Sequence, residues 1–352
     1  MTFNLVPDGF FTFYSPFSEE VSSTVEDLET GTLSWAEKFD LGQGDARATL
    51  LYALTGSKFM CHVYPHAKGN LAQALSDYSA WGFAANDHAV PADPAIRTCD
   101  VLHTLFRWVR AMRSPDSWVA GDDSLSAALR DTFLRLRDCM TPVQMHRFTA
   151  GQTSWLLDQA WETSLRERGA ALTVNEYLAM RIGAGGAYAA TSYIDAVEGI
   201  EVPDQEWASP IVRAAAEAGM MAGLLDNDRY SLGKESHPQF KKYNIFDAIR
   251  HENPDFSPQQ AMLRGIAIRD CLLVLYIRLC GQFLQGGSEE LRQYFVGVDR
   301  IISGNITYGT TALRYLNPAS AATIRYTEKP PADLPTTPLQ YPTIAWWWDH
   351  LK

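Results

Sequence analysis

The chain has 352 residues, of which 46% are hydrophobic, so it is long enough to bury a substantial core. Its formal net charge of −11 at pH 7 argues against nucleic acid as a partner, because such binding needs a basic surface. No run of about 18 uninterrupted apolar residues occurs, so we expect no membrane span.

The cysteines and the N-terminal residues indicate the cellular compartment of the protein. The five cysteines are odd in number, widely spaced and never arranged as Cys-x-x-Cys. This usage favours reduced thiols over a disulfide framework or a zinc site. Residues 1–5 contain no basic residue, and no signal peptide is recognisable. We therefore expect a cytoplasmic protein.

In chain order, the patterns predict three segments. Residues 1–30 combine prolines, glycines and aromatic side chains, and we expect an extended segment that packs over a helical body. Residues 31–316 form the expected helical domain. Within it we expect helices at 33–39, 46–61, 71–90, 94–112, 125–137, 142–168, 174–190, 207–231, 258–284 and 289–304. Residues 317–352 are rich in proline, which predicts an extended tail.

Strand and nucleotide-loop signals are scarce in this chain. Alternation with a period of two residues is rare, no Gly-x-Gly-x-x-Gly follows a strand pattern, and no repeat of 20–50 residues is found. We therefore predict an all-α fold, a single-domain antiparallel helical bundle. The tail ends in Trp346, Trp347 and Trp348, which would either pack on this body or contact another chain.

One polar stretch closes a mostly apolar helix pattern. Asn227, Ser231 and Glu235 are spaced four residues apart, and each step of four advances ~400° around an α-helix, so the three side chains share one face. Their oxygens suit a hard dication such as Mg²⁺, which completes its shell with water and substrate phosphates. Lys234 would reach a phosphate on the same metal. Helix capping is the alternative explanation for such residues.

The full string Asn-Asp-Arg-Tyr-Ser-Leu-Gly-Lys-Glu, residues 227–235, resembles the metal-binding triad of class I terpene synthases of the microbial type. The resemblance implies a helical bundle around a deep apolar pocket, up to three Mg²⁺ ions and a prenyl diphosphate substrate. It also makes a homodimer a possible assembly, since many family members are dimers.

A second metal face is expected at the end of the helix at 71–90, where the family carries an aspartate-rich motif. This chain departs from that motif, because Asn86 stands at the first aspartate position and only Asp87 is acidic. The later acidic position falls on Val90 or Pro91, and Asp93 lies beyond the proline. A neutral amide is a weaker Mg²⁺ ligand than a carboxylate, so this face lacks one formal charge. A solvated helix end is the alternative interpretation.

The resemblance also implies groups that bind the diphosphate. Arg181 corresponds to the diphosphate-sensing arginine, Ala184 to the linker residue and Gly185 to the effector residue at a helix break. Three glycines in four positions at 183–186 are unusual in a helix, since each costs ~1 kcal/mol relative to Ala. Near the C-terminus, Arg314 and Tyr315 resemble the late pair that closes on the diphosphate. A guanidinium group binds phosphate oxygens in a bidentate manner.

These features predict a Mg²⁺-dependent cyclase, a carbon–oxygen lyase that ionises a linear prenyl diphosphate and cyclises the carbocation. Phe83, one turn before Asn86, is the aromatic residue expected to line the pocket, where its ring would stabilise positive charge; Phe59 and Tyr78 are further candidates. Farnesyl diphosphate is the favoured substrate. A diterpene synthase that uses geranylgeranyl diphosphate or a cyclised C20 diphosphate is one alternative. Another is a non-catalytic prenyl-diphosphate-binding protein, because the aspartate-rich motif is degenerate. An elongating prenyltransferase would need a second aspartate-rich motif, which is missing.

Overall fold

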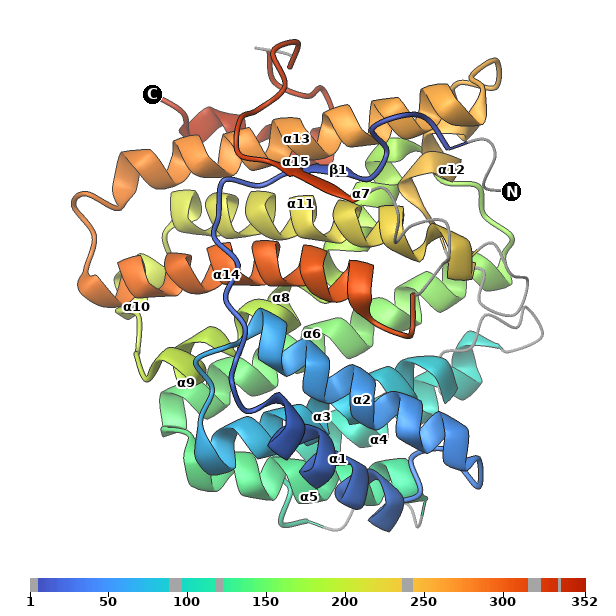
Figure 1. The fold of residues 1–352 in the computed structure, drawn as a ribbon, viewed down its shortest axis with the longest axis vertical. Helices are drawn as coiled ribbons and strands as arrows, with labels where there is room; N and C mark the ends of the chain where they lie inside the picture. Colours follow the sequence, from blue (N-terminus) through green and yellow to red (C-terminus); the bar gives the residue numbers. More distant parts are fainter. Residues whose placement is uncertain (1–5, 89–96, 118–122, 236–242, 316–323, 335–336) are drawn as a thin grey trace.

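Long helices dominate the computed structural model, which describes residues 6–88, 97–117, 123–235, 243–315, 324–334 and 337–352 (Figure 1). The helices are α1 (Val25–Lys38), α2 (Ala46–Val63), α3 (Gly69–His88), α4 (Thr98–Arg113), α5 (Ser124–Cys139), α6 (Pro142–Glu167), α7 (Val174–Ala184), α8 (Ala187–Thr191), α9 (Ile194–Glu198), α10 (Asp204–Trp207), α11 (Pro210–Glu235), α12 (Ile245–Glu252), α13 (Pro258–Phe283), α14 (Glu289–Thr311) and α15 (Pro342–Ala345). Two short strands, β1 (Thr12–Tyr14) and β2 (Arg325–Thr327), and a 3₁₀ helix at Trp348–His350 complete the secondary structure of the described residues. The all-α prediction is confirmed.

Helix α11 lies inside the bundle, between α13 and α14 (Figure 1). Its sequence suits this place, because alanines and glycines recur in its first half and let neighbouring helices approach closely. Gly219 illustrates the approach, since a Cβ there would lie 2.8 Å from the Tyr276 ring of α13. Proline at the first position starts the helix without losing a hydrogen bond. The first half of α11 therefore packs closely against its neighbouring helices.

Several predicted boundaries need correction. The first helix begins at Val25 and not at residue 33, so part of the segment predicted to be extended is helical. The helix predicted at 207–231 continues to Glu235, and that predicted at 289–304 continues to Thr311. The helix predicted at 174–190 is broken after Ala184, as the glycines at 183–186 indicated. Gly186 adopts φ +84°, a left-handed conformation that favours glycine.

The two ends of the chain meet on the outside of the bundle. β1 pairs in parallel with β2, with Phe13 opposite Tyr326, and Figure 1 shows the pair beside α11 and α13. The tail is not simply extended, because α15 and the 3₁₀ helix follow the short strand β2. Trp347 is 1% exposed and its Nε1 donates to Glu217 Oε2 at 2.9 Å, so this tryptophan packs on the body of the same chain.

None of the described helices combines the length and the apolarity needed to cross a membrane.

Candidate active site

The three predicted ligands lie on the last two turns of α11, at a cavity of about 240 Å³. Asn227 and Glu235 line this cavity, and Ser231 lies between them along the helix at 1% exposure. The Ser231 hydroxyl is buried and interacts with the Glu235 carboxylate, the next predicted ligand along the helix. An amide, a hydroxyl and a carboxylate oxygen are ligands that a hard dication accepts. The triad therefore fits an oxygen-binding dication.

Glu235 is held in place from a second element. Asn244, which caps α12, donates from Nδ2 to Glu235 Oε2 at 3.2 Å. Burial raises the pKa of Glu235, and the nearby Asp228 carboxylate raises it further. A bound cation would relieve this unfavourable burial of negative charge. Within the described residues no group of three His, Cys, Asp or Glu side chains could hold a metal ion, so a metal site here depends on the mixed amide, hydroxyl and carboxylate ligands.

Arg181 reaches the triad directly from α7. Its Nη2 donates to Asn227 Oδ1 at 2.7 Å and lies 2.8 Å from Asp228 Oδ1. Burial opposes the positive charge, but the neighbouring Tyr177, Asp228 and Glu235 outweigh it, and the pKa of Arg181 is raised. The arginine stays charged and adjoins the candidate metal ligands, as a diphosphate sensor must.

Asp228 belongs to the same motif but has a structural role. It is 1% exposed and accepts hydrogen bonds from the Tyr177 hydroxyl and from the backbone N–H of Ile245, the latter at 3.0 Å. Together with the Arg181 pair, these bonds join α7, α11 and the start of α12. Asp228 thus fixes Arg181 beside Asn227 and leaves the ligand positions to the predicted triad.

The second predicted face comes to the same cavity from α3. Asn86 lines the cavity, and its Nδ2 donates to Asp87 Oδ1 at 3.2 Å. Arg314 binds Asp87 in a bidentate manner, with Nη1 to Oδ2 at 2.7 Å and Nη2 to Oδ1 at 2.6 Å. Lys234 Nζ lies 3.7 Å from the same carboxylate. Val90, Pro91 and Asp93 lie outside the described residues.

Asp87 therefore pairs with two of the side chains that were predicted to bind the diphosphate, Arg314 and Lys234. Burial opposes the charge of Arg314, but Asp87 outweighs it, so the pKa of Arg314 is raised. Tyr315, the next residue, lies beside the triad, with its hydroxyl 3.5 Å from Asn227 Nδ2. Arg314 and Tyr315 thus bridge the two predicted metal faces. His88, the last residue of α3, lies with its Nε2 3.4 Å from the Tyr52 hydroxyl.

Aromatic rings form much of the cavity wall. Phe83 lines the cavity, as predicted, and meets Phe59 edge-on at 5.8 Å between ring centroids. Tyr308 on α14 contacts Phe59 at 5.3 Å, and Arg314 lies 5.1 Å from the centroid of the Phe83 ring. Tyr78 also lines the cavity. Such rings tolerate a nearby positive charge while excluding water.

The sequence reasoning missed several lining residues. Trp155 and Gln152 reach the cavity from α6, and Tyr230 and Asn305 reach it from α11 and α14. Tyr230 donates from its hydroxyl to Asn305 Oδ1 at 2.8 Å. Tyr230 belongs to the motif string, but the other three have no motif, because only helix packing brings them to the cavity.

The helix break forms another part of the wall. Ala184, Gly185 and Gly186 all line the cavity, and the Ala184 carbonyl accepts from Gln159 Nε2 at 2.6 Å. A Cβ at Gly185 would lie 2.6 Å from the Arg181 carbonyl oxygen and 2.7 Å from a methyl of Leu224. This crowding explains why glycine stands at the predicted effector position.

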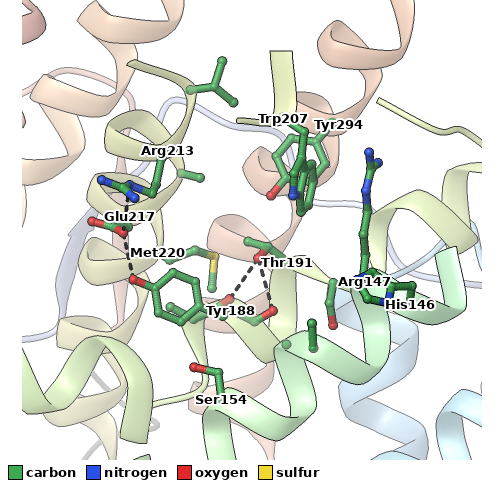
Figure 2. Close-up of a pocket in the computed structure, with 16 residues that line it drawn as sticks. His146, Arg147, Ser154, Tyr188, Thr191, Trp207, Arg213, Glu217, Met220 and Tyr294 are labelled. Carbon is green, nitrogen blue, oxygen red and sulfur yellow. Dashed lines mark hydrogen bonds and ion pairs between the residues drawn. The ribbon is translucent and has the colours of Figure 1, made fainter. Parts of the chain in front are cut away.

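A second, larger cavity of about 510 Å³ lies on the other side of α8 (Figure 2). It is lined by Tyr188, Thr191, Glu217, Trp207 and Tyr294, among others. Figure 2 shows Tyr188 in contact with Glu217, whose Oε1 accepts from the tyrosine hydroxyl at 2.7 Å. None of the predicted site residues lines this cavity. Size alone therefore does not identify the active site.

Comparisons with known proteins agree with this geometry. Residues 77–266 match the family described as "Terpene synthase family 2, C-terminal metal binding". The chain is 36% identical over 346 residues to the diterpene cyclase DtcycB of a Streptomyces species, covering 97% of this chain and 98% of the relative. It is 30% identical to spiroviolene synthase of Streptomyces violens over 76% of each chain.

Among solved structures, the crystal structure of SVS_A2, a protein from ancestral sequence reconstruction, superimposes with a TM-score of 0.85 at 28% identity and covers 98% of both chains. The family match spans more than half of this chain and includes both predicted metal faces. Together with the relative that is similar over nearly the whole length, it shows that the chain belongs to the class I terpene synthase family.

Proposed function

We propose that this terpene cyclase, a lyase that acts on prenyl diphosphates, uses Mg²⁺ and converts geranylgeranyl diphosphate into a cyclic diterpene. The observation that supports a C20 substrate is the 36% identity, over nearly the whole protein chain, to a relative named as a diterpene cyclase. This proposal replaces the expectation of farnesyl diphosphate as the first choice. The metal and the roles of single residues rest on the geometry of the cavity.

Asn227, Ser231 and Glu235 would hold the dication, with Asp87 on the facing helix α3. Mg²⁺, when bound, supplies Lewis acidity that stabilises the charge developing on the leaving diphosphate. Arg181 and the cations around Asp87 would donate hydrogen bonds to the diphosphate oxygens and neutralise their charge. Positioned donors of this kind act without reorganising during the reaction.

When substrate enters, Arg314 and Lys234 would leave Asp87 and bind the diphosphate, or would contact both Asp87 and the diphosphate. Both side chains already line the cavity. Phe59, Phe83 and Tyr308 would surround the carbocation, keep water away and present ring faces to the positive charge.

A sesquiterpene cyclase acting on farnesyl diphosphate is the second candidate. The cavity of about 240 Å³ favours it, because pockets that enclose drug-sized ligands measure roughly 300–1,000 Å³. A shorter prenyl chain would fit this cavity with less rearrangement of its lining residues. The two candidates share the ionisation machinery and differ only in the chain length that fits.

Purified protein incubated with Mg²⁺ and the C10, C15 and C20 diphosphates in turn tests the proposal. Gas chromatography of the extracts should show cyclic C20 products, with lower yields from the shorter substrates. Preferred turnover of the C15 substrate would support the second candidate, and longer linear diphosphates would indicate chain elongation. No turnover with any substrate would favour the non-catalytic binding protein.

A further inference from the structure

Two buried arginines bind the edge of β1 that faces away from β2. The strand lies beside α11 and α13 (Figure 1). Arg229 on α11 donates from Nε to the Phe10 carbonyl oxygen at 2.9 Å and from Nη2 to that of Thr12 at 2.8 Å. Arg269 on α13 donates from Nη1 to the Tyr14 carbonyl oxygen at 2.5 Å. Since successive carbonyls of a strand point to alternate edges, those of Thr12 and Tyr14 belong to one edge of β1, and Phe10 lies in the turn just before the strand. The guanidinium groups take the place of a third strand.

The charges are balanced within the same group of side chains, which we call the arginine cluster (Asp226, Arg229, Arg269 and Asp270). Asp226 accepts from Arg229 at 3.3 Å and from Arg269 at 2.6 Å, and Asp270 accepts from Arg269 at 3.0 Å. The four side chains are between 0 and 5% exposed. Burial lowers the pKa of Arg229 to about 10, so the residue remains a cation at neutral pH.

Arg229 also stacks on the strand that it binds. Its guanidinium carbon lies 3.9 Å from the centroid of the Phe13 ring and 5.6 Å from that of Phe10. The arginine is 2% exposed, so the contact is fully desolvated, where cation–π attraction is strongest. Hydrogen bonds and ring contacts together make Arg229 the main attachment of β1 to α11.

The cluster lies behind the candidate metal ligands. Arg229 is two residues from both Asn227 and Ser231, and two residues turn an α-helix by ~200°, so Arg229 points away from the ligand face. β1 is also joined to β2, which begins at Arg325, ten residues after Tyr315. The same strand is therefore attached to the helix of the metal ligands and to the chain that follows the diphosphate-binding pair.

We propose that Arg229 is a positioning residue for the binding of divalent metal and diphosphate. By holding β1 against α11, it keeps the end of α11 in place, and with it the positions of Asn227 and Ser231, although no residue of β1 lines the cavity. The inference rests on the proposed function only for the choice of ligand. Through Arg229, the N-terminal strand β1 would thus help to position the metal ligands.

The test compares wild-type protein with Arg229→Gln and Arg229→Lys. Each is titrated with Mg²⁺ in the presence of inorganic pyrophosphate by isothermal calorimetry, which needs no turnover. Groups that orient metal ligands typically change metal affinity by about 10- to 100-fold. We expect about a tenfold weaker apparent Mg²⁺ affinity for Arg229→Gln. A smaller loss is expected for Arg229→Lys, which keeps the charge but has no fork to span two carbonyls.

Arg147→Gln is the matched control. Arg147 on α6 is also buried: it donates to Asp195 Oδ2 at 2.6 Å and to the Val202 carbonyl oxygen at 2.7 Å, and it lies 4.4 Å from the centroid of a Trp207 ring. It lines the second cavity and not the active site. Its loss should lower the melting temperature and leave Mg²⁺ affinity unchanged.

Wild-type affinity in Arg229→Gln, or an equal loss in Arg147→Gln, would overturn the positioning role. If Arg229→Gln does not fold, Arg229→Lys decides between the same outcomes. A wild-type protein that fails to bind pyrophosphate with Mg²⁺ would instead contradict the proposed function and the inference together, so the two failures are distinguishable.

Discussion

The surroundings of Glu235 are unfavourable for a charged carboxylate but suitable for binding a cation. Its carboxylate is buried, has a raised pKa and lies on the same ridge as Asn227 and Ser231. Burial of such a group does not favour folding, and a bound cation would offset its cost. The fold itself therefore has little reason to keep a glutamate at position 235.

Replacing Glu235 with glutamine keeps the shape and removes the charge. We expect product formation to fall by at least about 100-fold, which corresponds to about 2.7 kcal/mol in the barrier. Steady-state release of diphosphate measures it. Glu217→Gln is the control, because Glu217 lies on the same helix but lines the second cavity; a similar loss there would remove the triad from the mechanism.

Asp299 on α14 predicts a pH dependence of stability. Burial raises its pKa from 3.8 to about 7, although the Tyr276 hydroxyl donates to it at 2.6 Å. The folded state therefore holds a proton that the unfolded state loses near pH 4. This stabilisation is complete below pH 4 and is lost as pH rises to about 7. Its full size is about 4 kcal/mol, since one pKa unit corresponds to about 1.4 kcal/mol.

Asp299→Asn removes the titrating group and should flatten this dependence. Urea unfolding of both proteins at pH 5 and pH 7.5 measures it. Wild type should lose more stability than the variant between these two values. Equal losses in the two proteins would mean that Asp299 titrates normally in the fold.

At the scale of elements, the break between α7 and α8 decides the shape of the cavity. Gly185→Ala would press a methyl group against the Arg181 carbonyl and Leu224, and so displace the wall next to Asn227. We expect kcat/KM to fall by about tenfold, or about 1.4 kcal/mol, with a modest loss of stability. Gly281→Ala in α13, where nothing lies within 4 Å of the added carbon, should leave kcat/KM unchanged. Full activity of Gly185→Ala would exclude a tight requirement at this position.

The elements were predictable to different degrees. Long apolar patterns identified α2, α3, α5, α6, α11 and α13 to within a few residues, because helix periodicity and capping act locally. The short α9, α10, α12 and α15 were missed, since four to eight residues carry too little pattern. Their conformation depends on neighbours distant in sequence.

At the scale of the whole molecule, the tail is part of the fold. Trp347 is buried, and its indole N–H binds Glu217 of α11. Trp347→Ala should lower the free energy of unfolding by about 3–5 kcal/mol, as large aromatic truncations in cores do. Urea denaturation tests it, with Trp348→Ala, which is only partly buried, as the milder control. An equal effect of the two substitutions would contradict the distinct role of Trp347.

Three predictions at this scale stay predictions: the division at residues 30 and 316, the homodimer and the cytoplasmic location. The structure describes one chain and its contacts. The catalytic roles of single residues are also predictions, which the variants described above test.

The sequence by itself determined the fold class, because helix periodicity is a local property of the chain, and the motif at residues 227–235 indicated the reaction type through its resemblance to a known family. Only the tertiary structure decided which groups face the predicted ligands of that motif. Asp87 and Arg314 are 227 residues apart along the chain, and Arg229 meets Phe10 across 219 residues. Such contacts depend on how whole helices pack, and no local pattern encodes that packing.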